Sequence, residues 1–239
     1  MVSRIVFNLI NKLACFFKGE SYALDDAVPV SSLIFYGLSR TLALLRCFCR
    51  GIRFTLNPKK LIFIGSDVVL KNRRQISFGR GVTIERGAYI DGLSIKGVTI
   101  GDNVKLGAYT IIEPTGVLTS IGNGFSIGSN SGVGAFSFIG AAGGVAIGEN
   151  VIIGQRASFH SENHVIRCID IPIRNQGVTR QGIRIEDDCW IGANVTFLDG
   201  ATVGKGCVIA AGAVVRTNIP PYSIAAGIPA TVIRNRKDG

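Results

Sequence analysis

The chain has 239 residues, of which 47% are hydrophobic and 18% charged, and a formal net charge of +10. This composition excludes an intrinsically disordered chain and suffices for a domain with a sizeable core. The positive charge favours an anionic partner, which could be nucleic acid, a membrane surface or a phosphorylated small molecule. No basic stripe interleaved with aromatic residues crosses the repetitive region described below, so no nucleic-acid partner is expected.

The first segment, residues 1–58, is apolar and basic and lacks the repeats that follow. From Leu33 to Phe54, arginines enter an apolar sequence at near-helical spacing, which predicts one or two amphipathic helices. These arginines are Arg40, Arg46, Arg50 and Arg53. Such helices could cover an open β-edge, or attach to a membrane surface through the apolar face and the arginines. No uninterrupted apolar run reaches the ~20 residues of a membrane span, so no spanning helix is expected.

In the second segment, residues 59–219, aliphatic residues recur every six positions and most precede Gly or an acidic residue. The clearest run is Ile185, Ile191, Phe197, Val203, Ile209 and Val215. This period fits neither a helix nor a lone alternating strand, but it fits a short strand, a corner and another short strand. Three such units close a triangular coil, and stacked coils pair their backbones. We therefore predict a mainly β fold, a parallel β-helix, followed by a short tail at residues 220–239.

One long interruption of the repeat, residues 160–182, contains both histidines of the chain. It is polar and aperiodic, so it should loop out of the β-helix wall as an excursion, where repeat proteins often carry function. Histidine titrates nearest neutrality and is the natural general base, and position alone leaves both His160 and His164 open. The six cysteines show no metal-ligand spacing, so we expect reduced thiols in a cytoplasmic protein and no metal.

The repeats, the stretch Ser161-Glu162-Asn163-His164 and the ending Ile219–Ala230 resemble the hexapeptide-repeat acyltransferases, in the branch of sugar and polysaccharide O-acetyltransferases. The resemblance covers roughly residues 61–236. It implies that the β-helix is left-handed, that the protein is a homotrimer, and that acetyl-CoA is the acyl donor.

The same resemblance places the catalytic histidine on His164, as a general base that lets a sugar hydroxyl attack the thioester directly. His160 is then expected to be structural. The group that orients the His164 imidazole stays open among the carboxylates of Glu162, Asp170 and Glu113 and a backbone carbonyl.

Residues 186–195 resemble the family signature that precedes the final coils, where relatives bind coenzyme A in a groove between two subunits. The resemblance implies that Ala193 and Ala211 bring their backbones to the pantetheine arm. Trp190 could pack on that arm, on the acceptor or against a corner. Arg216 and Arg234 are expected at the phosphates, although relatives usually carry the basic residue one position after Arg216.

The predicted function is therefore acetyl-CoA-dependent O-acetylation of a sugar hydroxyl on a cell-surface polysaccharide or lipid-linked precursor. N-acylation of an amino sugar or nucleotide-amino sugar remains an alternative, because the base chemistry is nearly the same. A carbonic anhydrase of this fold would need three zinc-binding histidines, and a nucleotidyltransferase would need a Gly-rich nucleotide-binding domain; the sequence has neither. A purely structural β-helix would leave the excursion, the Trp190 segment and the ending unexplained. Peripheral contact with the inner face of the membrane is expected through residues 1–58.

Overall fold

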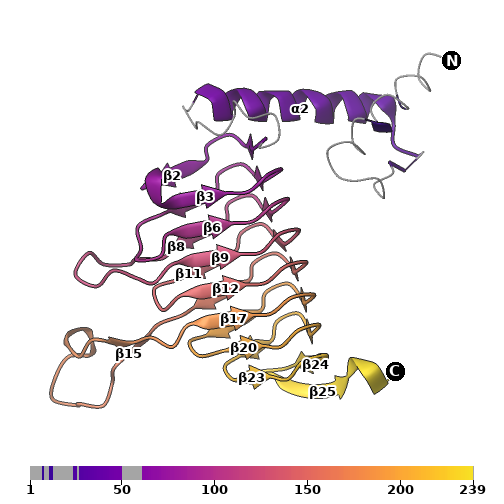
Figure 1. Ribbon diagram of the computed structural model, residues 1–239. Helices are drawn as coiled ribbons and strands as arrows, with labels where there is room; N and C mark the ends of the chain where they lie inside the picture. The colour runs from indigo at the N-terminus through magenta and orange to yellow at the C-terminus, as the bar shows by residue number, and fades with distance from the viewer. Residues whose placement is uncertain (1–6, 8–10, 13–23, 26, 50–60, 239) are drawn as a thin grey trace.

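The chain winds into a stack of triangular coils with one helix across its N-terminal end (Figure 1). The computed structural model describes residues 7, 11–12, 24–25, 27–49 and 61–238. Three parallel sheets form the sides of the stack, and each coil contributes one short strand to each sheet. The fold is a left-handed parallel β-helix, mainly β, with an N-terminal helical segment, which confirms the predicted fold class.

Sheet A has nine strands, and the last one runs antiparallel to the rest. Its strands are β1 (Phe63–Ile64), β4 (Thr83–Ile84), β7 (Lys105–Leu106), β10 (Gly132–Val133), β13 (Ile152–Ile153), β18 (Trp190–Ile191), β21 (Val208–Ile209), β24 (Ser223–Ala226) and β25 (Thr231–Asn235). The segment predicted as a tail from residue 220 thus contains β24 and β25, which extend this sheet.

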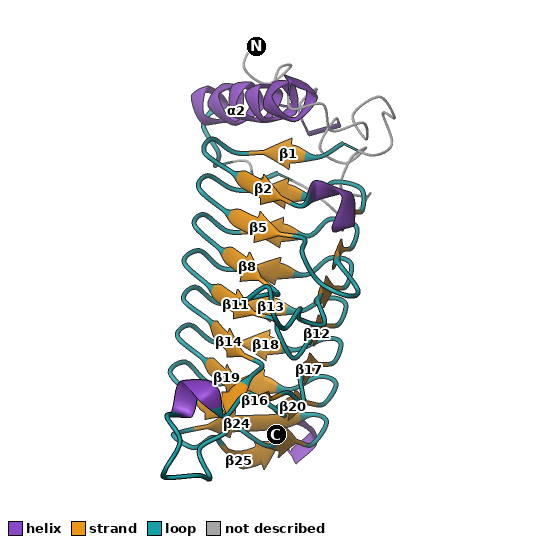
Figure 2. Cartoon of the chain, turned by 90° about the vertical axis from the view of Figure 1, so that its left-hand side faces the viewer, coloured by secondary structure: helices purple, strands orange, loops and turns teal. Residues whose placement is uncertain are grey.

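Sheets B and C have seven strands each, and Figure 2 shows the sheet B strands stacked one above another. Sheet B comprises β2 (Val69–Lys71), β5 (Tyr89–Asp91), β8 (Ile111–Glu113), β11 (Phe138–Gly140), β14 (Ser158–His160), β19 (Thr196–Leu198) and β22 (Val214–Val215). Sheet C comprises β3 (Ile76–Phe78), β6 (Val98–Ile100), β9 (Phe125–Ile127), β12 (Val145–Ile147), β17 (Ile183–Ile185), β20 (Thr202–Val203) and β23 (Asn218–Ile219). The remaining strands of the described residues form a separate hairpin, β15 (Asn163–His164) with β16 (Val178–Thr179). Short 3-10 turns in the same part of the chain are η2 (Arg73–Gln75), η3 (Ile173–Asn175) and η4 (Arg236–Asp238).

The six-residue repeat places at least one apolar side chain of most strands inside the stack, and the three-residue strands of sheet C place two there. In sheet A, for example, Ile153, Ile191 and Ile209 are in register on neighbouring strands and each is at most 3% exposed. Because these side chains stack in ladders, burial of each one also buries its neighbours above and below. In sheet B the inward ladder includes two aromatic rings, Phe159 and Phe197, which stack with their centroids 4.8 Å apart.

Glycine follows the inward residue where consecutive corners stack closely. At the corner between sheets A and B, a Cβ on Gly154 would lie 2.6 Å from the backbone nitrogen of Ala193. No other residue fits there without moving the backbone of the next coil. The close spacing between coils at this corner therefore requires the Gly that recurs in the repeat.

Helix α2 (Val30–Cys49) crosses the open end of the first coil and packs against β1. Its buried residues are Leu33, Ala43 and Cys47. Arg40 points to the same side, with its guanidinium 4.5 Å from the Phe63 ring centroid and its Nη1 donating to Thr83 Oγ1 at 2.8 Å. The expectation that the arginines line a lipid-facing rim is therefore wrong for Arg40. Arg50 and Arg53 lie outside the described residues.

The helix is also more apolar on average than the sequence pattern suggested. Its 20 residues include an 18-residue window of mean hydropathy 1.3, so by length and composition it could cross a membrane. The expectation that no segment is long and apolar enough to cross a membrane was wrong, because the two arginines in this helix leave its mean hydropathy high. Core helices and signal sequences pass the same criterion, so the criterion alone assigns no membrane span.

Candidate functional site

The excursion leaves sheet B after β14 and returns to sheet C at β17, so it projects from the corner between these two sheets (Figure 1). Its two arms form the antiparallel hairpin β15–β16, in which Asn163 pairs with Thr179 and His164 with Val178. Residues 161–182 loop out of the wall, with more internal order than a polar, aperiodic sequence indicates, whereas His160, predicted to be in the excursion, is the last residue of β14.

Both ends of the hairpin are fixed to the wall by buried polar side chains. At the exit, Ser161 is 1% exposed, and its Oγ donates to the Gly140 carbonyl at 2.8 Å and accepts from the Gly143 amide at 2.9 Å. At the return, the carboxylate of Asp199, 8% exposed, accepts the amides of Gln181 and Gly182 at 2.8 Å. Charge-assisted bonds of this kind are among the stronger hydrogen bonds in proteins. The base of the hairpin is thus held on both sides.

Arg180 connects the hairpin to the loop of an earlier coil. Its guanidinium pairs with Glu162 across the hairpin base, with both Nε and Nη2 at 2.7 Å from Oε2. The same group donates to the carbonyls of Ser120 and Ile121 at 3.2 Å. The Arg180 side chain is only 18% exposed, so these bonds are partly shielded from water. Arg180 therefore fixes the direction in which the hairpin leaves the wall.

The tip of the excursion is closed by the Gln176 amide. Its Oε1 accepts from the Cys168 amide at 3.0 Å, while its Nε2 donates to the carbonyls of Cys168 and Ile171 at 2.6 and 2.7 Å. The η3 turn lies just before this residue. One side chain thus adds to the backbone hydrogen bonds of the loop, such as the bond from the Val165 amide to the Gly177 carbonyl at 3.0 Å.

His164 lies on this fixed hairpin with its side chain exposed. In the described part of this chain, no side chain hydrogen-bonds to its imidazole. Of the three carboxylates left open, Glu162 is paired with Arg180, Asp170 is exposed in the loop, and Glu113 lies in sheet B, in register with Gly140. Within one chain, therefore, the structure assigns no orienting group to His164.

His160 has a different environment at the end of β14. Its Nε2 lies 2.9 Å from Ser158 Oγ, and its ring lies against Phe138 with the centroids 5.7 Å apart. These contacts attach His160 to the wall of sheet B, away from the hairpin arm that carries His164.

Two of the five residues predicted to bind coenzyme A, Trp190 and Arg234, lie on another surface, the outer face of sheet A. Trp190, Val208, Ile224 and Arg234 are in register on β18, β21, β24 and β25. Trp190 is 58% exposed, so its indole stands on this face and is not packed in a corner. Arg234 lies three strands further on, about 14 Å at the usual spacing between strands.

The two alanines lie at the corner between sheets A and B, next to that row. Gly212, directly after Ala211, donates its amide to the Ala193 carbonyl at 2.8 Å, so the two corners stack. The structure therefore brings Trp190, Ala193 and Ala211 onto one surface. Arg216 is exposed but lies past the far end of β22, at the corner between sheets B and C. It is on the side of the excursion and not beside the alanines.

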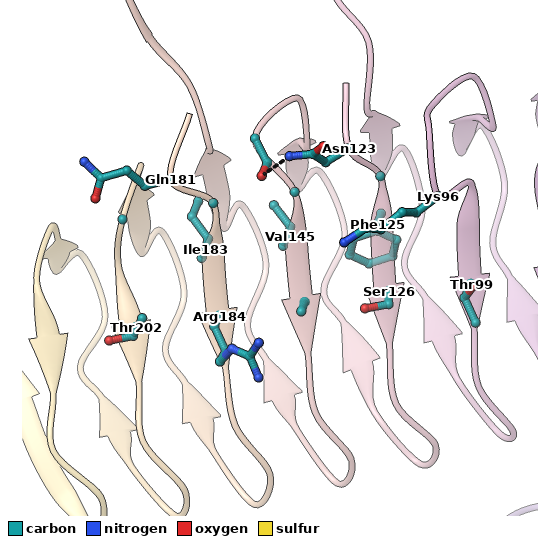
Figure 3. Close-up of a pocket in the computed structure, with 16 residues that line it drawn as sticks. Lys96, Thr99, Asn123, Phe125, Ser126, Val145, Gln181, Ile183, Arg184 and Thr202 are labelled. Atoms are coloured by element: carbon teal, nitrogen blue, oxygen red, sulfur yellow. Dashed lines mark hydrogen bonds between the residues drawn. The ribbon is translucent and has the colours of Figure 1, made fainter. Parts of the chain in front are cut away.

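Two hollows flank these surfaces. The first, about 640 Å³, follows the outer face of sheet C at the base of the excursion, and Figure 3 shows its polar lining, including Lys96, Asn123 and Arg184. Its described lining contains two basic side chains and no carboxylate, which favours an anionic or hydroxyl-rich ligand. The second, about 650 Å³, lies on sheet A and ends at Ile152, the register partner of Trp190. His164 lines neither hollow.

We term the surface formed by Trp190, Ala193 and Ala211 the Trp190 surface. Two buried thiols, Cys189 and Cys207, lie beneath it. Burial raises the pKa of the Cys189 thiol to about 11 and also raises the pKa of Cys207. A thiol in this state stays protonated at neutral pH and is a poor nucleophile. Among the described residues, no group of three or more His, Cys, Asp or Glu side chains could hold a metal ion.

Two of the anchoring residues, Asp199 and Arg180, had not been identified from the sequence as part of the site, and Ser161 had been noted only as part of the stretch that resembles the catalytic loop. Asp199 carried a weak signal, since an acidic residue follows directly on β19, the neighbour of the strand where the excursion starts. Nothing in the sequence indicated the role of Arg180, because its hydrogen-bond partners lie 18 to 60 positions away.

Residues 182–217, which begin where the excursion returns, match the family described as bacterial transferase hexapeptide (six repeats). The matched residues include four of the five residues predicted to bind coenzyme A, all except Arg234.

A protein of Mycobacterium tuberculosis named as a probable acetyltransferase is 48% identical over 75 residues, which are 31% of this chain and 25% of that protein. The chain thus matches about a quarter of this relative's length. AntD, an N-acyltransferase from Bacillus cereus in complex with dTDP and 3-hydroxybutyryl-CoA, is 19% identical with a TM-score of 0.49, over 75% of this chain and 81% of that one. A hexapeptide-repeat acetyltransferase from Vibrio cholerae, complexed with acetyl coenzyme A, is 20% identical with a TM-score of 0.33, over 98% and 89% of the two chains.

Replacing Arg180 with Ala should release the hairpin base from Glu162 and from the earlier loop. We expect turnover to fall about tenfold or more, because misplacing a catalytic group by a small distance is costly. Trypsin should also cut faster at the exposed Arg167 and Arg174 of the excursion. Arg180→Lys keeps the charge but not the several directed hydrogen bonds, so its turnover and its rate of trypsin cleavage should lie between those of the wild type and Arg180→Ala. Unchanged turnover and trypsin rates in Arg180→Ala would show that Arg180 does not position the hairpin.

Proposed function

We propose that the protein is an acetyl-CoA-dependent O-acetyltransferase that modifies a sugar hydroxyl of a cell-surface polysaccharide or lipid-linked precursor. The observation that carries this proposal is the fixed hairpin that presents His164 immediately ahead of the transferase repeats. A non-catalytic β-helix would have no use for a loop secured at its exit, return and tip.

In the proposed reaction, the neutral imidazole of His164 accepts the proton of the sugar hydroxyl as its oxygen attacks the thioester carbonyl. A C–O bond forms and the carbonyl oxygen becomes an oxyanion, which backbone amides in the groove would stabilise. Collapse of this intermediate breaks the C–S bond, and the imidazolium returns its proton to the departing thiolate. The products are the acetyl ester and free coenzyme A.

Direct attack is favoured over a covalent acyl-enzyme because, among the described residues, no exposed thiol lies beside Trp190. The two thiols closest to it, Cys189 and Cys207, are buried, and burial raises the pKa of each. A protonated, enclosed sulfur can neither attack a thioester nor reach it.

We further propose that each site forms between two copies of the chain in a homotrimer. In one chain, His164 lies off the corner between sheets B and C, whereas Trp190, Ala193 and Ala211 lie on sheet A and its corner with sheet B. One chain therefore presents the two halves of the site on different edges of its triangle. A neighbour could close the groove and supply the group that orients the imidazole. The corner location of Arg216 is compatible with a phosphate contact from the neighbouring copy.

The test of the acyl transfer is release of free coenzyme A from acetyl-CoA in the presence of sugar acceptors. One panel carries only hydroxyl groups and the other carries the same sugars with one amine. Acceptor-dependent thiol release with the hydroxyl panel, and an acetyl ester in the product, supports the proposal. Release only with amino sugars would make the protein an N-acyltransferase. Release at the same rate without any acceptor would contradict sugar transfer.

A further inference from the structure

Helix α2 has two apolar faces, and only one of them is used to cap the β-helix. The capping face carries Leu33, Ala43 and Cys47, all buried, and Arg40, whose guanidinium lies over the Phe63 ring. The first coil is therefore closed without the rest of the helix surface. Capping and membrane contact, which the sequence presented as competing uses of one face, involve different faces.

The outer face of α2 is covered by large apolar side chains that no described residue buries. Those between 51% and 69% exposed are Ile34, Phe35, Tyr36, Leu38, Leu42, Leu45 and Phe48. At 100° per residue, all of these except Tyr36 fall within a stripe about 140° wide, opposite the buried face. An exposed apolar stripe of this length on a helix is typical of an interaction surface.

The charge of the N-terminal part of the sequence indicates what the stripe contacts. Residues 1–60 contain nine Lys and Arg but only three Asp and Glu, so a quarter of the chain carries +6 of the total charge of +10. The first coils add Lys71 and Arg74 as exposed basic side chains, while Arg80 is paired with Asp102. A second copy of this end would bring like charges together, whereas an anionic lipid surface would attract them.

We propose that the outer stripe of α2 inserts into the surface of an anionic lipid bilayer, with the helix lying in the plane of the membrane. The helix cannot both span the bilayer and keep its inner face on the first coil, so the packed Leu33, Ala43 and Cys47 hold it parallel to the surface. Arg46, half-buried and at the edge of the stripe, lies where its charge can meet the headgroups.

The proposal is tested by flotation of the full chain with vesicles of phosphatidylglycerol and phosphatidylcholine. The wild type should float at low salt and progressively less as salt is raised. The variant Ile34→Gln/Leu38→Gln/Leu45→Gln keeps the charge and uses a good helix former, and should partition about 100-fold more weakly. The matched control, Ile95→Gln/Leu118→Gln/Ile228→Gln, changes three exposed apolar residues far from α2 and should float like the wild type.

Circular dichroism and oligomeric state, measured without lipid, establish that each variant keeps the native fold. A wild type that does not float, or a helix variant that floats as well as the control, would overturn the proposal. If instead the wild type does not float but forms an oligomer without lipid, and this oligomer dissociates in the helix variant, the stripe would be assigned to contact with a second copy of the chain.

Discussion

Replacing His164 with Ala should lower kcat by about 10² to 10⁴, the usual contribution of a general base. The affinity for coenzyme A should stay close to that of the wild type, because the thioester is expected on the Trp190 surface. His164 is exposed and no described side chain of its own chain depends on it, so its loss should not disturb folding. Steady-state kinetics with the acceptor found by thiol release, together with coenzyme A titration, measure both effects.

The control for this experiment is His160→Ala. His160 contacts Ser158 and the Phe138 ring on the sheet wall, so we expect its removal to leave turnover close to that of the wild type. If His160→Ala abolished turnover and His164→Ala did not, the base would be His160. The mechanism would then have to be placed on the wall of sheet B.

Replacing Phe159 with Ala should destabilise the protein by about 3 to 5 kcal/mol, the usual cost of deleting a fully buried aromatic ring. Phe159 and Phe197 are both 0% exposed and stack on each other, so the deletion leaves a cavity between two coils. The β-helix backbone on either side is paired and cannot collapse into the gap. Urea unfolding at one fixed protein concentration measures the change, because assembly would otherwise contribute.

The matched variant is Phe136→Ala, which removes the same ring from a corner where it is 58% exposed. We expect a loss of about 1 kcal/mol or less there, since the ring mainly stacks on Tyr109 at the surface. Equal losses at the two positions would mean that the inward ladder does not dominate stability.

The sequence predicted the fold well because one simple constraint repeats in every coil. An inward aliphatic residue such as Ile191 must be followed by a small residue, here Gly192, whose Cβ would lie 2.5 Å from the Ala211 nitrogen. That constraint is local and periodic, so it can be read without knowing the tertiary contacts. The excursion was visible for the same reason, as the stretch where the constraint is absent.

The order of the excursion could not be read, because it depends on contacts between distant positions. Arg180 joins Glu162 to carbonyls about 60 positions earlier, and Asp199 holds a return strand that lies 17 positions before it. The predicted orientation of the Arg40 side chain was wrong for a related reason. Helical spacing gives the angle of a side chain around the helix axis, but it does not say which angle faces the first coil.

The grouping of the predicted coenzyme A residues was only partly visible in the sequence. Ala193 and Ala211 are exactly one coil apart, 18 positions, so the repeat alone places them in neighbouring corners. Arg216 lies only five positions after Ala211, but those positions cross a whole strand of the triangle. Residues a few positions apart in the sequence can therefore lie on different corners of the triangle, whereas residues one full coil apart lie in neighbouring corners.

The most direct test of the proposed shared site is activity of mixed trimers made from two inactive chains. One chain carries His164→Ala, and the other carries Ala211→Trp, which places a large side chain on the exposed corner expected to receive pantetheine. If each site takes His164 from one copy and the groove from its neighbour, random assembly at equal amounts restores about a quarter of the sites. Differently tagged chains establish that mixed trimers have formed. Activity near a quarter of the wild type is the predicted result, and no activity in verified mixed trimers, or a fully active monomer, would contradict the shared site.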